Sequence, residues 1–132
     1  MSQKILIIED NDNIRRFIRT TLSLEGYAVE EATTVRSGLD QARKHQPALV
    51  LLDLALPDGT GWDFLESLRG LEFSQRPRVA ILTASADHGM ADRSLAAGAD
   101  EFITKPIAAG ALVSVVRRVL QAGRAASAGA GL

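Results

Sequence analysis

The chain has 132 residues, of which 46% are apolar and 23% are charged. This suits one domain with a hydrophobic core rather than two domains, and it differs from the composition of disordered chains. The net charge of −1 lacks the basic excess that attracts nucleic acid, and the absence of cysteine excludes disulfides and thiolate metal sites. Because the apolar runs are also too short to span a bilayer, we expect one cytoplasmic domain that binds neither DNA nor membrane.

The first part of the chain alternates short apolar runs with stretches of helical spacing. Residues 5–8 predict a strand, and the apolar positions between 14 and 22 recur with the period of a helix. A second strand is predicted over 27–31. The helix after it starts at Thr33 or Thr34, which are good capping residues, and ends before the next proline.

The second part of the chain continues the same alternation. Residues 49–52 are apolar without a break, which is typical of a central parallel strand covered on both faces. A polar, glycine-containing loop follows this strand. The remaining predicted elements are a short helix through 64–68, a strand at 79–82, a weaker helix over about 87–97, a short strand at 102–103 and a last helix through 112–120.

Five strand–helix repeats predict an α/β domain of (βα)5 type. Strands joined through helices are parallel and their crossovers are right-handed, so helices cover both faces of one sheet and make three layers. Functional residues of such sheets gather beyond the carboxyl ends of the strands. We assign residues 1–122 to the domain and residues 123–132, which are rich in alanine and glycine, to a flexible tail or linker.

Polar residues follow four of the predicted strands at the same edge of the sheet. They are Glu9 and Asp10, then Asp53, Thr83 and Lys105. Each of them alone fits a helix cap, a turn or a solvated loop charge. Together the carboxylates would repel one another unless a cation lies among them, and a site with oxygen ligands only favours a hard ion such as Mg²⁺.

A metal site of this kind suits phosphate chemistry. An ionised carboxylate can attack phosphorus and form an aspartyl phosphate, and such a transfer needs mainly positioning and charge neutralisation. Asp53 would be the nucleophile. The metal, the ammonium of Lys105 and the hydroxyl of Thr83 would each hold one phosphoryl oxygen.

Four segments carry a resemblance to a known family. The chain resembles the receiver (CheY-like) domain of bacterial two-component response regulators over roughly residues 3–122. The resemblance implies the flavodoxin-like fold with strand order 2-1-3-4-5. The segments are Ile-Leu-Ile-Ile-Glu-Asp-Asn at 5–11, Leu-Val-Leu-Leu-Asp-Leu-Ala-Leu-Pro-Asp-Gly-Thr-Gly at 49–61, Ile-Leu-Thr-Ala at 81–84 and Gly-Ala-Asp-Glu-Phe-Ile-Thr-Lys-Pro at 98–106.

The same resemblance implies roles for individual residues. Asp53 is expected to be the phosphoacceptor. The Mg²⁺ ligands are expected to be Asp10, Asp53, the backbone carbonyl of Ala55 and, mostly through water, Glu9. The residues expected to bind phosphate and switch are the pair Thr83 and Phe102, with Ala84 leaving access to Asp53 and Lys105 sensing the phosphate, and the peptide bond before Pro106 is expected to be cis.

The function implied is phosphorelay signalling rather than turnover of an external substrate. A sensor histidine kinase or phosphotransfer protein would donate the phosphoryl group, and the domain would catalyse only its own phosphorylation and dephosphorylation. The face made by the fourth helix, fifth strand and fifth helix would then change shape for a downstream effector. Ala111 and Val115 replace charges of the symmetric dimer known in this family, so we expect a monomer or a phosphorylation-dependent dimer.

Two other functions compete with this interpretation. A phosphatase of the haloacid dehalogenase type has similar motifs, but it needs a second aspartate two residues after the nucleophile as acid and base, where this chain has Ala55. A phosphate-independent interaction module is the other alternative. The intact set of acidic residues, threonine and lysine argues against it.

Overall fold

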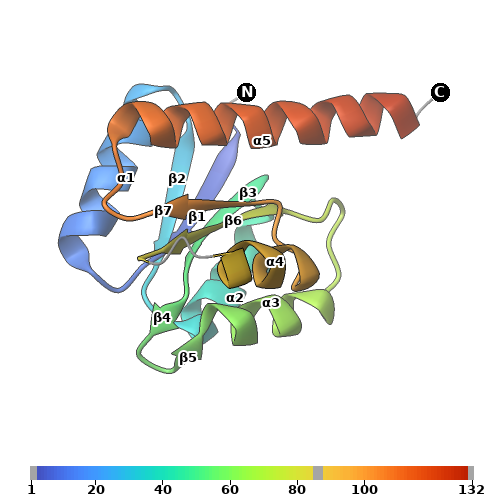
Figure 1. Cartoon of the computed structure of the whole chain (residues 1–132). Helices are drawn as coiled ribbons and strands as arrows, with labels where there is room; N and C mark the ends of the chain where they lie inside the picture. The colour runs from blue at the N-terminus through green and yellow to red at the C-terminus, as the bar shows by residue number, and fades with distance from the viewer. Residues whose placement is uncertain (1–2, 85–87, 131–132) are drawn as a thin grey trace.

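Five parallel strands form the central sheet of the computed structural model, which describes residues 3–84 and 88–130 (Figure 1). The sheet has the order β2-β1-β3-β6-β7, which is the predicted order 2-1-3-4-5 when its strands alone are counted along the chain. The flavodoxin-like prediction is therefore confirmed. The strands are β1 (Lys4–Ile8), β2 (Ala28–Ala32), β3 (Leu49–Asp53), β6 (Arg78–Thr83) and β7 (Glu101–Thr104).

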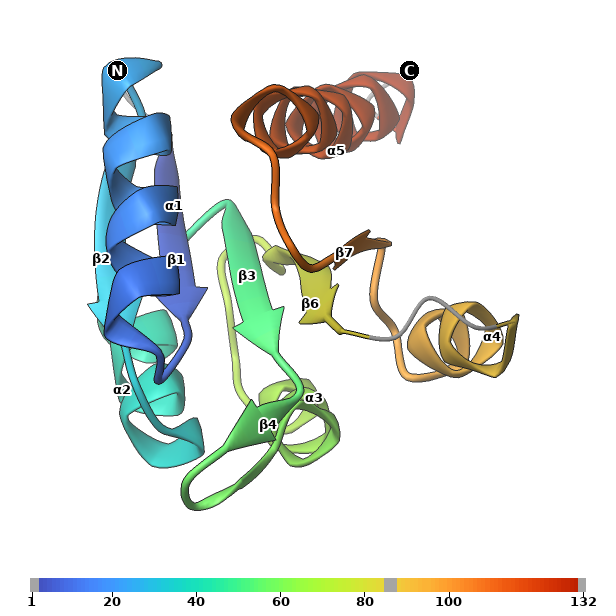
Figure 2. The same cartoon turned by 60° about the vertical axis from the view of Figure 1, so that its left-hand side comes forward.

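Helices cover both faces of this sheet. One face packs against α1 (Asp12–Leu24) and α5 (Ala109–Ala130), and the opposite face packs against α2 (Val35–His45) and α3 (Gly61–Arg69) (Figure 2). Helix α4 (His88–Ala96) lies beyond the β7 edge. The predicted start of this helix at residue 87 falls outside the described residues.

Neighbouring side chains of a central strand pack into different layers of the core, on opposite faces of the sheet. In β3, Leu51 packs toward α1 and α5, whereas Leu52 packs toward α2 and α3, and both are fully buried. In β1, Ile7 and Ile8 divide in the same way. Burial of each such side chain stabilises the fold by roughly 1.5–3 kcal/mol before entropy is counted.

A small hairpin follows β3 where the sequence analysis expected only a loop. Strands β4 (Ala55–Leu56) and β5 (Gly59–Thr60) pair in antiparallel fashion. The turn carries Asp58, whose carboxylate accepts hydrogen bonds from the backbone N–H groups of Val35 at 2.7 Å and Arg36 at 3.1 Å. Two-residue strands carry too little periodicity to be recognised from sequence.

The last helix extends past the predicted domain boundary. Helix α5 continues to Ala130, so residues 123–130 are helical where a flexible segment was expected. Alanine has the highest helix propensity, which favours continuation of α5 despite the glycines. The assignment of these residues to a linker stays a prediction. Within the described ranges, no helix combines the length and the apolar character needed to cross a membrane.

Candidate functional site

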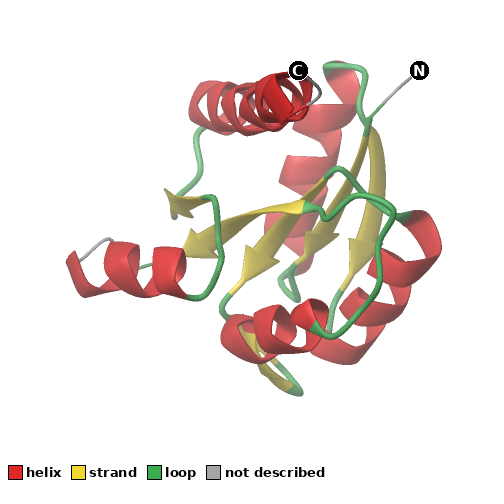
Figure 3. Cartoon of the chain, turned by 90° about the vertical axis from the view of Figure 1, so that its right-hand side faces the viewer, coloured by secondary structure: helices red, strands yellow, loops and turns green. Residues whose placement is uncertain are grey.

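The parallel strands bring their carboxyl ends to one edge of the sheet, as the arrows in Figure 3 show. Ile8 of β1 pairs with Leu52 of β3, and Asp53 pairs with Leu82 of β6. This register places the residues after Ile8 level with Asp53. The carboxylates of Glu9, Asp10 and Asp53 consequently each offer an oxygen within 4.8 Å of the others.

Lys105 brings a positive charge into this acidic cluster. Its Nζ donates a hydrogen bond to Oε1 of Glu9 at 2.7 Å and lies 3.4 Å from Oδ1 of Asp53. Glu9 is fully buried, and Asp53 is only 7% exposed. Ninety-six positions separate Lys105 from Glu9, so the fold alone brings them together.

Burial and the close approach of charged groups shift the pKa values of Glu9 and Lys105 in the cluster. Burial raises the pKa of Glu9 to about 7, a hydrogen bond with Asp53 acts in the same direction, and the contact with Lys105 opposes both effects. Burial tends to lower the pKa of the Lys105 ammonium, but the hydrogen bond to Glu9 and the charges of Glu9 and Asp53 outweigh it, and the pKa is raised. The cluster therefore favours added positive charge.

The donor set suits a hard divalent cation. The three carboxylates supply oxygen ligands only, and Mg²⁺ binds through a few carboxylates while it keeps several waters. The backbone N–H of Ala55 donates to Oδ1 of Asp53 at 3.3 Å, so Ala55 lies beside the cluster. The use of its carbonyl as a ligand stays a prediction.

The predicted switch residues lie on β6 and β7, the two strands on one side of β3. Thr83 ends β6 and is buried, and Ala84, which follows it, is exposed. Phe102 is half-buried and pairs with Ile81, one strand over. The backbone N–H of Lys105 donates to the carbonyl of Thr83 at 2.7 Å, and the Lys105–Pro106 peptide bond is cis.

Arg15 and Gly61 contact the main chain at the acidic cluster, although the sequence pattern gave neither of them a role there. Arg15 of α1 donates a hydrogen bond to the backbone carbonyl of Glu9 at 3.0 Å. Gly61 approaches the main chain after β3 so closely that an added Cβ would lie 2.9 Å from the carbonyl oxygen of Asp53. The sequence shows an arginine on a helix and a glycine in a loop, and neither pattern names its tertiary partner.

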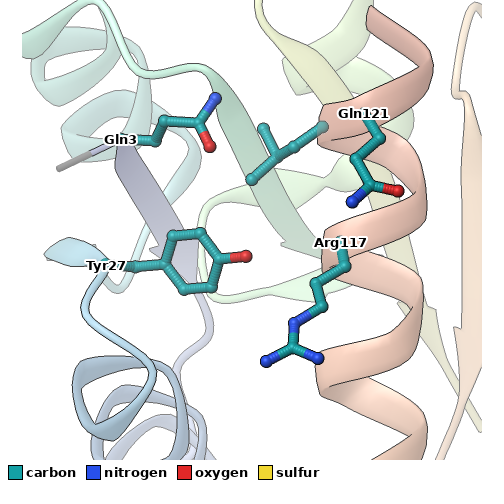
Figure 4. Close-up of a pocket in the computed structure, with 5 residues that line it drawn as sticks. Gln3, Tyr27, Arg117 and Gln121 are labelled. Carbon is teal, nitrogen blue, oxygen red and sulfur yellow. The ribbon is translucent and has the colours of Figure 1, made fainter. Parts of the chain in front are cut away.

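Two hollows lie at opposite ends of the sheet. One of about 490 Å³ adjoins Lys105, and its mostly apolar lining comes from α1 and the segment before α5: Asn13, Ile14, Phe17, Ile18, Lys105, Pro106 and Ile107. The other, of about 220 Å³, lies near the amino ends of β1 and β2, where Gln3 and Tyr27 face Arg117 and Gln121 of α5 (Figure 4). Only the first adjoins the acidic cluster.

Comparison with known proteins decides the family. The family model described as the response regulator receiver domain matches residues 5–117, which is most of the chain. The chain belongs to this receiver family. The predicted family is thus confirmed, and with it the general role of a signalling module in two-component systems. Receiver domains also generally bind Mg²⁺, which agrees with the acidic cluster.

Two of the curated relatives are named as transcriptional regulatory proteins. The receiver domain is 41% identical over 117 residues to the KDP operon transcriptional regulatory protein KdpE of Escherichia coli, covering 89% of this chain and 51% of that protein. It is 33% identical over 121 residues to the phosphate regulon transcriptional regulatory protein PhoB of Escherichia coli, covering 92% and 53%. The chain thus spans about half the length of these relatives.

Solved structures agree with this assignment. The chemotaxis protein CheY4 of Vibrio cholerae superposes with a TM-score of 0.85 at 27% identity, covering 90% of this chain and 99% of that chain. NtrX of Brucella abortus gives a TM-score of 0.90 at 26% identity, covering 99% of this chain and 29% of the longer NtrX chain. Both structures support the flavodoxin-like fold of this chain.

Proposed function

We propose that this receiver domain accepts a phosphoryl group on Asp53 from a phosphohistidine of a sensor kinase or phosphotransfer protein, with Mg²⁺ bound at the acidic cluster. The observation that carries this proposal is the placement of the Lys105 ammonium, 2.7 Å from Glu9 and 3.4 Å from Asp53. This fixed cation would neutralise the charge of a phosphoryl group transferred to the neighbouring carboxylate.

Asp53 would act as the nucleophile without a general base. One carboxylate oxygen forms a bond to phosphorus while the bond from phosphorus to the donor imidazole breaks, and the electron pair stays with the imidazole, which takes a proton from solvent. Lys105 and the hydroxyl of Thr83 would stabilise the phosphoryl oxygens. Glu9, Asp10, Asp53 and the carbonyl of Ala55 would hold the metal, whose chemistry is to neutralise charge on the transferred group.

Phosphorylation would act on the switch residues through added charge. A phosphoryl group on Asp53 carries about −2 charge and three acceptor oxygens, which would attract both Thr83 and Lys105. The backbone hydrogen bond from Lys105 to Thr83 would couple their movements. Phe102 would then occupy the space that Thr83 leaves, and the face of α4, β7 and α5 would change its population between two states.

The hollow beside Lys105 is the proposed contact site for the phosphoryl donor protein. Its apolar lining from α1, including Phe17 and Ile18, adjoins the predicted phosphoacceptor. Exposed basic residues Arg16 and Arg19 lie on the same helix. A helical domain that presents a phosphohistidine would find both an apolar surface and positive charge there, and this domain itself would not bind nucleic acid.

The charged residues near the α4–β7–α5 face bear on the proposed output and oligomeric state. Arg118 pairs with Glu101 at 2.6 Å and Arg78 pairs with Asp100 at 3.1 Å, so these charges are bonded within one molecule. We expect a monomer that dimerises, if at all, after phosphorylation. The signal would pass to an effector domain or protein in the cytoplasm.

Acetyl phosphate provides a direct test. The protein is incubated with acetyl phosphate and Mg²⁺ and weighed by mass spectrometry, together with Asp53→Asn and with Asp40→Asn, which removes an exposed carboxylate from α2. We expect one phosphoryl adduct on the wild type and on Asp40→Asn, none on Asp53→Asn, and none for any variant in EDTA.

The two competing functions give different results in this experiment. Continuous release of phosphate from added phosphate esters would indicate a phosphatase. A wild-type protein that stays unmodified at saturating Mg²⁺ would indicate a phosphate-independent interaction module. An adduct that persists in Asp53→Asn would assign the phosphoacceptor to another residue.

A further inference from the structure

Arg15 links three elements beside the acidic cluster. One guanidinium nitrogen donates to the backbone carbonyl of Glu9 at 3.0 Å, and another lies 2.6 Å from Oδ1 of Asp12. Its Nε lies 3.2 Å from Oε1 of Glu31, which also pairs with Arg19 at 3.2 Å. The end of β1, the first turn of α1 and the end of β2 are thereby joined through one side chain.

The hydrogen bond from Arg15 helps to hold the backbone of Glu9, the residue that directly follows β1. The backbone N–H of Glu9 donates to the carbonyl of Ala32 at 3.1 Å, and its own carbonyl accepts from Arg15. The backbone of Glu9 is thus held on both sides. The direction in which Glu9 and Asp10 present their carboxylates depends on this short stretch of main chain.

The burial of Arg15 supports a positioning role. Its side chain is only 18% exposed although it lies on a surface helix, and the partner Glu31 is 29% exposed. The pKa of Arg15 is raised, first by the hydrogen bond to Asp12 and then by the charges of Asp12 and Glu31, while burial opposes the shift. A planar guanidinium can serve these three acceptors at once, which a lysine ammonium on its flexible stem cannot do with the same geometry.

We propose that Arg15 is a positioning residue of the metal site, which it preorganises by holding the backbone carbonyl of Glu9. The inference rests on the proposed Mg²⁺ site and adds a residue that contacts neither metal nor phosphate. In other proteins, mutation of a residue that orients a metal ligand without touching the metal typically lowers metal affinity by about 10- to 100-fold. Charge alone predicts the opposite sign, because loss of a cation and exposure of the charges of Asp12 and Glu31 would attract Mg²⁺.

The test compares Arg15→Ala, Arg15→Lys and the matched control Arg16→Ala. Arg16 is the next residue on α1 and is exposed, so its loss removes the same charge without removing the bond to Glu9. Mg²⁺ affinity is measured by isothermal titration calorimetry on protein shown to be folded by circular dichroism. We expect weakening on the order of 10-fold for Arg15→Ala, less for Arg15→Lys, and unchanged or slightly tighter binding for Arg16→Ala.

Thermal unfolding in EDTA separates positioning from general stability. Weaker Mg²⁺ binding in Arg15→Lys than in Arg16→Ala, measured well below the unfolding temperature of both variants, supports the role. Unchanged or tighter binding in both Arg15 variants overturns it and leaves the metal site standing. A wild-type protein with no Mg²⁺ affinity overturns the metal site and the role of Arg15 together.

Discussion

Gly61 shows how a single residue shapes the backbone around the predicted phosphoacceptor. Its N–H donates to the carbonyl of Leu54 at 2.9 Å, so the start of α3 lies directly against the chain that leaves β3. An added Cβ would come within 2.9 Å of the carbonyl oxygen of Asp53 and 3.1 Å of Cα of Leu54. Both are main-chain contacts that cannot rotate away.

A Gly61→Ala substitution should therefore displace the backbone beside Asp53. We expect a loss of about 1–3 kcal/mol in the free energy of unfolding, the usual cost of an overpacked site, and slower phosphorylation of Asp53. Chemical denaturation measures the first effect and the acetyl phosphate reaction the second.

Gly110 provides the control for this substitution. A Cβ there meets nothing within 4 Å, and the residue lies in the first turn of α5. Gly110→Ala should leave phosphorylation unchanged and stabilise the fold by up to about 1 kcal/mol through helix propensity. Equal behaviour of the two variants would show that the contact at Gly61 carries no cost.

At the scale of elements, the β4–β5 hairpin joins the loop of the predicted phosphoacceptor to helix α2. Asp58 in its turn accepts from the N–H groups of Val35 and Arg36, while the side chain of Thr34 accepts from the N–H of Ser37 at 3.0 Å. The first N–H groups of α2 are thus bonded by residues from two places in the chain. A carboxylate at a helix N-terminus also interacts favourably with the helix dipole.

The Asp58 contact should make stability depend on pH. Backbone hydrogen bonds from Val35 and Arg36 lower the pKa of Asp58 from its ordinary value of 3.8, so the ionised form is favoured in the folded state. The stabilisation is present above that ordinary value and is lost as the pH falls through the lowered one. Asp58→Asn should be less stable than the wild type near pH 6, and the difference should shrink below about pH 4.

Urea denaturation at several pH values measures this difference. The control is Asp40→Asn, which removes an exposed carboxylate from within helix α2. It should not reproduce the effect of Asp58→Asn. A deficit of Asp58→Asn that is as large at pH 3 as at pH 6 would mean that its origin is not the charge.

At the scale of the whole molecule, β3 connects the two layers of the core. Its five residues are all buried, and successive side chains enter the core on opposite faces of the sheet. The two layers therefore share one backbone. We expect the domain to unfold as one cooperative unit, as small domains generally do.

Truncation of Leu51 and of Leu52 tests this cooperativity. Each change to alanine should cost about 2–5 kcal/mol, because each side chain is fully buried in a different layer. Trp62 of α3 is the single tryptophan and packs against the Leu52 layer. Its fluorescence and far-UV circular dichroism should nevertheless report the same transition in both variants.

The exposed Leu24 serves as the control, since it is 83% exposed and its change to alanine should alter stability by less than about 0.5 kcal/mol. Separate transitions for the two probes in Leu51→Ala would show that the layers unfold independently.

The strand–helix alternation, the parallel sheet and the edge that carries the acidic cluster follow from the sequence. Apolar periodicity is a local property, and parallel strands necessarily place their carboxyl ends together, so the sequence alone groups Glu9, Asp10, Asp53, Thr83 and Lys105 at one edge. Residues 123–130 show the limit of such reasoning, since their composition suits a linker as well as the continued helix of α5.

Only the tertiary structure decided which atoms meet. The bond of Arg15 to the carbonyl of Glu9, the cap that Asp58 provides for α2 and the approach of Gly61 to Asp53 involve main-chain atoms, which carry no residue identity. The 2.7 Å contact of Lys105 with Glu9 spans 96 positions and joins the ends of β1 and β7, which β3 and β6 separate in the sheet. Sequence pattern determines which face or edge a residue occupies, whereas close packing of the folded chain determines its partners.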